Sequence, residues 1–159
     1  MLVSLDFNLK KLNSFLAKNE LKSEKVLLDS LVVEIIHLEA VQTEISTFLA
    51  THSNVLALTV DTVQINDRSP IEVALASYDN LNIYAQAGLT SEKALLDSLL
   101  VEIVRQEAVL AEISLFKTDN STILALTINT VQISDTTGVE NALTQYELLS
   151  LYAKTQLTS

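Results

Sequence analysis

The chain contains no cysteine and no tryptophan, and it has only two glycines and one proline. The absence of cysteine excludes a disulfide framework, thiolate catalysis and zinc–thiolate sites. Because glycine and proline are so rare, long flexible linkers are not expected. Aromatic residues make up 5% of the chain, which argues against surfaces that stack sugars or bases.

Basic residues are also scarce, with 10 Lys and Arg against 20 Asp and Glu and a net charge of −10. This acidic balance argues against a nucleic-acid partner and against an anionic membrane surface, since both require clustered cations. No apolar run reaches the roughly 18 residues of a membrane span. The first residues lack a basic segment followed by a continuous apolar segment, so no signal peptide is expected. Cytoplasmic location is the default prediction, while extracellular location by a non-standard export route or after signal removal stays open.

What the chain does have is an internal duplication. About 36 of 68 positions are identical when residues 21–88 are aligned without gaps to residues 89–156. A fixed period of this length is typical of arrays whose units bury their apolar faces against one another. The predicted organisation is an N-terminal segment over residues 1–20, a first repeat over 21–88 and a second repeat over 89–159.

Each repeat is expected to begin with a long helix, over residues 23–51 in the first copy. Ser23 and its counterpart Ser91 are candidate N-caps. Apolar residues follow the three- and four-residue spacing of one helical face, as at Leu28, Leu31 and Ile35. Other apolar residues lie outside this stripe, which is typical of a helix that is covered on several sides.

The middle of each repeat, over residues 54–65 and 122–133, allows two interpretations. Its apolar residues surround a narrow polar arc on a helical wheel, which favours a short helix. Its many Val, Ile and Thr residues favour a strand instead. A third element over residues 69–87 shows a capping-box pattern from Ser69 to Glu72, and Gly88 is expected to end it in a left-handed conformation.

These patterns predict an all-α protein, a tandem duplication of a three-helix unit (long, short, medium) preceded by an N-terminal capping helix. The alternative is an α+β fold in which residues 54–65 and 122–133 are strands. The final residues, from Leu157 on, repeat the beginning of a long helix. The second repeat is therefore expected to offer a face related to the one that the first repeat uses internally.

Few residues suggest chemistry. Glu34 and His37 match a Glu-x-x-His pattern found in di-iron bundles, but the second copy has Glu102 and Arg105, and arginine cannot be a metal ligand. We interpret both pairs as charge pairs three residues apart. Acids retained in both copies, such as Glu107, are expected to lie on a solvated face or in ion pairs between helices. No catalytic residue, cofactor or metal is predicted, and the chain is not expected to be an enzyme.

Aromatic residues are the candidate interface residues. Tyrosines recur six residues apart in each copy, so one ring is expected in the core and the other at a rim or a subunit contact. Phenylalanines of the capping helix are expected to contribute an apolar face. The candidate set is Tyr78, Tyr84, Tyr146, Tyr152, Phe7 and Phe15.

The leading functional prediction is a structural, self-assembling repeat protein, the subunit of a filament or other homopolymer that acts through helix–helix contacts. The alternative is a monomeric helical binding or regulatory module that holds a protein partner in a groove between the repeats. The expected partner is therefore the chain itself or another protein.

Overall fold

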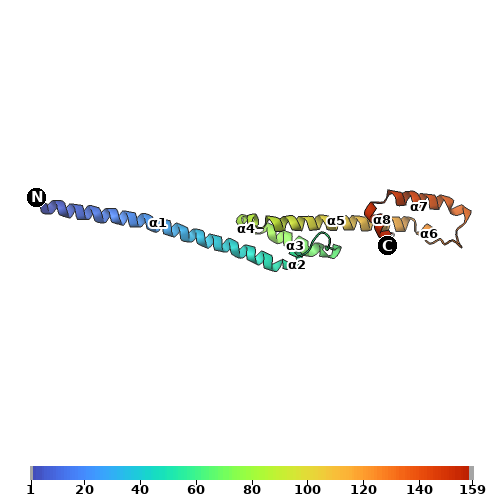
Figure 1. Ribbon diagram of the computed structural model, residues 1–159, viewed down its shortest axis with the longest axis horizontal. Helices are drawn as coiled ribbons and strands as arrows, with labels where there is room; N and C mark the ends of the chain where they lie inside the picture. Colours follow the sequence, from blue (N-terminus) through green and yellow to red (C-terminus); the bar gives the residue numbers. More distant parts are fainter. Residues whose placement is uncertain (1, 158–159) are drawn as a thin grey trace. The chain divides into compact units, whose positions relative to one another are not determined.

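The computed structural model describes residues 2–157 and the side chains of residues 8–157. Throughout this part of the chain the regular secondary structure is helical, with no strand (Figure 1). The predicted all-α class is confirmed. The α+β alternative, with strands at 54–65 and 122–133, is wrong.

The chain divides into two compact units, which do not follow the repeat boundaries. The first unit comprises residues 1–51 and 80–89, and the second comprises 52–79 and 90–159. The first contains α1 (Leu2–Thr51) and α4 (Ile83–Gly88). The second contains the following elements in chain order: α2 (Ser53–Leu56), η1 (Ile65–Asp67), α3 (Arg68–Asp79), α5 (Thr90–Asp119), α6 (Ser121–Leu124), η2 (Ile133–Asp135), α7 (Thr136–Leu148) and α8 (Leu151–Leu157).

The first long helix has no boundary near residue 20. α1 is a single helix of 50 residues that passes through Ser23, so Ser23 is not an N-cap and residues 1–20 are not a separate capping helix. The second copy does break, because α4 ends at Gly88 and α5 starts at Thr90. Glu20 occupies the position that matches Gly88. Glutamate favours the helix interior over glycine by about 0.5–1 kcal/mol, which explains why the helix continues only in the first copy.

The middle element of each repeat is mostly a turn. The predicted helix over 54–65 is wrong beyond α2, because the chain leaves the helix after Leu56. The Thr62 hydroxyl oxygen accepts a hydrogen bond from the Thr59 backbone N–H at 2.9 Å. Thr130 and Thr127 form the same turn in the second copy, at 2.8 Å. Threonine hydroxyls compete with helical hydrogen bonding in this way.

The capping boxes lie earlier in the chain than the sequence pattern indicated. Gln64 and Asp67 form one at η1, where the Gln64 N–H donates to the Asp67 carboxylate at 2.9 Å. Gln132 and Asp135 repeat it at η2. Ser69 lies inside α3, which begins one residue earlier, so the predicted Ser69 cap is wrong.

Gly88 does not adopt a left-handed conformation, and no described residue has a positive φ. Instead, Gly88 is the last residue of α4, where an added Cβ would lie 2.8 Å from Ile45 Cδ1 of α1. The missing side chain of Gly88 allows α4 to approach α1 closely within the first unit. Ala85 of α4 is fully buried in the same unit.

The second unit has its core along α5. α3 packs along α5, and both helices contribute side chains that are fully shielded from solvent: Ile71, Ala74, Leu96, Leu99 and Ile103. A smaller cluster lies nearer the end of α5, where Val109 and Ile113 pack with Ala153 of α8. α5 is thus covered by α3 along its first half and by α8 along its second.

Candidate interaction surfaces

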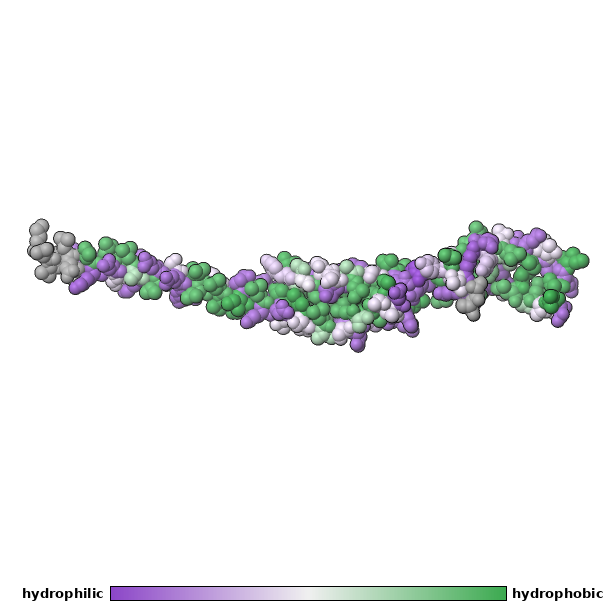
Figure 2. Space-filling model, in the orientation of Figure 1, coloured by the Kyte–Doolittle hydropathy of each residue, from purple (hydrophilic) through white to green (hydrophobic). Residues whose placement is uncertain are grey.

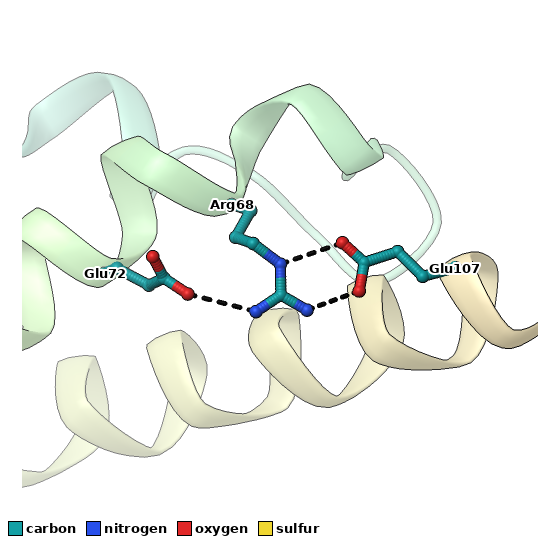
Figure 3. A network of polar contacts seen from close by, with 3 residues as sticks. All are labelled: Arg68, Glu72 and Glu107. Carbon is teal, nitrogen blue, oxygen red and sulfur yellow. Dashed lines mark hydrogen bonds and ion pairs between the residues drawn. The ribbon is translucent and has the colours of Figure 1, made fainter.

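A bidentate ion pair fixes one end of the seam between α3 and α5. The Arg68 guanidinium donates to both carboxylate oxygens of Glu107, from Nε at 2.8 Å and from Nη2 at 2.5 Å, and its Nη1 donates to Glu72 at 3.0 Å (Figure 3). These bonds raise the pKa of Arg68 and lower the pKa of Glu107. The expected inter-helix ion pair is confirmed for Glu107. Because both side chains are about a third exposed, the pair mainly sets the register of the helices.

The other end of the seam is marked by Lys93, whose ammonium lies 6.0 Å from the centroid of the Tyr78 ring. α3 therefore runs antiparallel to α5. This register places Ile71 of α3 opposite Ile103 of α5 and Ala74 opposite Leu99, so the residues of each helix shield those of the other from solvent. Gln106 adds a directional bond, since its side-chain amide donates to the carbonyl of Val63 at 3.0 Å.

The matching face of α1 has no such cover among the described residues. Leu28, Leu31 and Ile35, here named the apolar stripe, are identical to Leu96, Leu99 and Ile103 of α5. The stripe residues are 50–61% exposed, whereas each α5 counterpart is 0% exposed. Figure 2 shows hydrophobic surface along α1 beside polar side chains. The same sequence is thus core in one helix and surface in the other.

The counterpart of the face that covers α5 contains a groove. α2 and α3 both pack on α5, and α6 and α7 are their counterparts. A groove of about 430 Å³, here named the α6–α7 groove, lies between α6, α7 and the end of α5, where Phe116 and Lys117 line it. Its lining includes residues whose counterparts in α2 and α3 are buried, together with neighbouring apolar side chains: Ile123, Val139, Ala142, Leu143, Tyr146 and Leu157. Its α6 and α7 residues correspond in sequence to residues of α2 and α3.

Two retained acids bind the start of the following short helix. The Glu112 carboxylate accepts from both the backbone N–H and the hydroxyl of Ser150, each at 2.6 Å. These bonds lower the pKa of Glu112. In the first unit, Glu44 accepts from the backbone N–H of Asn82 at 2.9 Å, and Asn82 caps α4 by accepting from Tyr84 N–H. The role is structural in both units.

The predicted pair of Glu102 and Arg105 is confirmed, with Nη2 2.5 Å from Oε1. Hydrogen bonds from Arg105 and then Gln106 lower the pKa of Glu102 to about 2. The predicted pair of Glu34 and His37 is wrong, because no ion pair joins these two side chains. His37 instead meets the ring of Tyr84 edge-on, with centroids 4.9 Å apart.

The candidate aromatic residues occupy separate environments and form no common cluster in the part of the chain that the structure describes. Tyr78 and Tyr146 are half-buried, whereas Tyr84 and Tyr152 are exposed. Tyr146 meets Phe116 edge-on, and the Arg105 guanidinium lies 4.0 Å from the Tyr152 ring centroid.

The phenylalanine predictions differ in outcome. Phe15 is exposed on α1, and Phe7 lies outside the residues whose side chains are described. The apolar stripe was absent from the predicted interface. The signal that could have found it is the match of Leu28, Leu31 and Ile35 to the second copy, since identical residues need similar cover.

No metal site or membrane segment is seen in residues 8–157. No three Asp, Glu or His side chains there lie close enough to hold a metal ion. None of the described helices is both long and apolar enough to cross a bilayer. Comparisons with protein-family models, curated proteins and solved structures found no match.

Proposed function

We propose that the chain is a structural, non-catalytic subunit that assembles with copies of itself through helix–helix contacts into a filament or other homopolymer. The observation that carries the proposal is the contrast between identical residues. Leu28, Leu31 and Ile35 are at least half exposed on α1, while the same side chains at matching positions of α5 are fully buried.

An exposed stripe of this kind is costly for an isolated soluble chain. Scattered apolar residues on a surface are ordinary, but contiguous ones mark a contact surface. The stripe lies on a helix that is apolar on more than one face, as Val32 and Val33 are also exposed. Burying such a helix against a partner removes this surface from water, at roughly 25 cal/mol per Å².

The two surfaces differ from each other, as the contact of an open polymer requires. The apolar stripe lies on α1, and the α6–α7 groove is built by different elements. A contact between two different surfaces is heterologous, and it propagates into a ring if the rotation closes and into a filament if it does not. A symmetric dimer would instead use both surfaces twice, with the stripe of each copy in the groove of the other.

Sedimentation velocity of the purified full chain over a wide concentration range, followed by negative-stain microscopy, tests the proposal. We expect the sedimentation coefficient to rise with concentration, and the association to weaken on cooling because burial of apolar surface is its driving force. A chain that stays strictly monomeric at high concentration would refute self-assembly.

A second candidate is a monomeric binding or regulatory module. The α6–α7 groove, which lies within the second repeat and not between the repeats, favours it, because an apolar groove of this size can hold the apolar face of a partner helix. A strict monomer that binds an amphipathic helical peptide would support this function over the first.

A further inference from the structure

We propose that the α6–α7 groove of one copy binds residues 25–39 of α1 of a second copy, in the register that α5 takes against α2 and α3. The inference rests on the self-assembly proposed above and names the surfaces that would make it. Its template is the seam between α3 and α5 inside the second unit.

The apolar residues of the seam inside the second unit recur in the proposed contact between copies. On one side, Leu28, Leu31 and Ile35 repeat the α5 residues without change. On the other side, Ala142 repeats Ala74 of α3, while Val139 replaces Ile71 of α3 and Ile123 replaces Val55 of α2, so one methylene is lost and one is gained. A stripe that fits between α2 and α3 therefore also fits between α6 and α7, since volume-conserving exchanges are well tolerated in packed contacts.

The aromatic end of the seam is conserved as well. Tyr146 repeats Tyr78, and Lys25 repeats Lys93. Lys25 is held by Asp29 at 2.6 Å, just as Lys93 is held by Asp97 at 2.7 Å. In the register of the template, the Lys25 ammonium would approach the Tyr146 ring of the second copy, whose centroid lies 5.6 Å from the Lys154 ammonium of the same copy.

The polar anchors of the seam are not conserved. Arg68 is replaced by Thr136, while its partner Glu107 is retained as Glu39. Gln106 is replaced by Leu38, which cannot donate to a carbonyl. The contact between copies thus keeps the apolar surface of the internal seam and loses its ion pair, so it is the weaker of the two.

Leu31→Asp tests the α1 side, and Val33→Asp is its matched control. Leu31 is counterpart to a fully buried residue, whereas Val33 is counterpart to Val101, which stays 70% exposed in α5. Both positions are exposed on α1, so neither change should unfold the chain. We expect Leu31→Asp to weaken association at least about 100-fold, because it would bury an unpaired carboxylate. Val33→Asp should leave association nearly unchanged.

Leu143→Asp tests the groove side independently, since Leu143 lines the groove and is itself exposed. It should block polymers as Leu31→Asp does. An equimolar mixture of the two blocked variants should form a 1:1 dimer and nothing larger. The intact groove of Leu31→Asp would bind the intact stripe of Leu143→Asp. The opposite contact, between the altered stripe and the altered groove, would place two aspartates together.

Thr136→Arg is a gain-of-function test, since it gives Glu39 of the other copy an arginine partner, as Glu107 has in Arg68. The change should tighten association by about three- to fivefold at low salt, as expected for a partly exposed ion pair. The gain should disappear in a Glu39→Gln background.

Sedimentation velocity with circular dichroism on each variant separates the outcomes. If the wild type assembles and only Leu31→Asp and Leu143→Asp abolish assembly, the proposal is supported. If the wild type assembles and Val33→Asp disrupts it as much as Leu31→Asp, self-assembly stands and the assigned surfaces are wrong. A wild type that never assembles overturns both.

Discussion

The duplicated sequence permits one substitution to be made twice, in two environments, within the same molecule. Leu99→Ala removes a side chain that is 0% exposed in the core of the second unit, whereas Leu31→Ala removes the identical residue where it is 50% exposed. A buried Leu→Ala change costs about 2–5 kcal/mol through lost transfer energy and the cavity that remains. At Leu31 about half of that transfer term is absent and no cavity forms. Since alanine also favours the helix, the expected cost is below about 1 kcal/mol.

Urea unfolding followed by far-ultraviolet circular dichroism measures both costs. The protein concentration must lie below the onset of association, because Leu31 is expected to become buried between copies. We expect the two variants to differ by at least about 1 kcal/mol in unfolding free energy. Equal costs would show that α1 and α5 bury the same face in the free chain, and the argument for an open stripe would fail. At high concentration, the Leu31→Ala cost should grow.

Three further predictions address the second unit and the close approach in the first. The pKa of Glu102 is about 2 in the folded chain against an ordinary value of 4.5, so its stabilisation is complete above about pH 4.5 and is lost as the pH falls toward 2. Glu102→Gln should therefore flatten the slope of acid unfolding curves; the pKa of Glu112 is also lowered, so its stabilisation too is lost in acid. Ser150→Ala should destabilise α8 by about 1 kcal/mol through the lost cap, seen as faster amide exchange in that helix without a change in α3. Gly88→Ala should cost less than about 1 kcal/mol in thermal unfolding, since only the flexible end of Ile45 obstructs the new methyl, and Ile45→Val should relieve that cost.

Helical class and the apolar periodicity of the long helices could be predicted from the sequence, because a stripe such as Leu96, Leu99 and Ile103 carries its own period. The ends of the helices could not. Whether a helix continues past residue 20 depends on glutamate or glycine at one position. The turn at Thr59 depends on a threonine hydroxyl that replaces a helical bond, and neither choice alters the hydrophobic pattern.

The candidate surface was only partly accessible to sequence reasoning. Periodicity identified the stripe on α1. It could not show that the identical residues of α5 are covered while those of α1 are exposed. Burial depends on which segment packs where, and the α2–α3 pair packs on α5, in the unit that excludes α1. The tyrosines drew attention because they are large and repeated, yet their ring contacts are local.

The hydrogen bond from the Gln106 amide to the Val63 carbonyl affects which long helix can bind the surface formed by α2 and α3. The two long helices carry the same stripe, so α1 of another molecule could compete for the seat that α5 fills. Glu39 of α1 and Glu107 of α5 could both pair with Arg68, so this ion pair does not distinguish the two helices. Leu38, however, would leave the carbonyl of a buried residue without a donor, a penalty of about 1–3 kcal/mol. The Gln106 amide thus favours α5 over α1 of another molecule at the surface formed by α2 and α3.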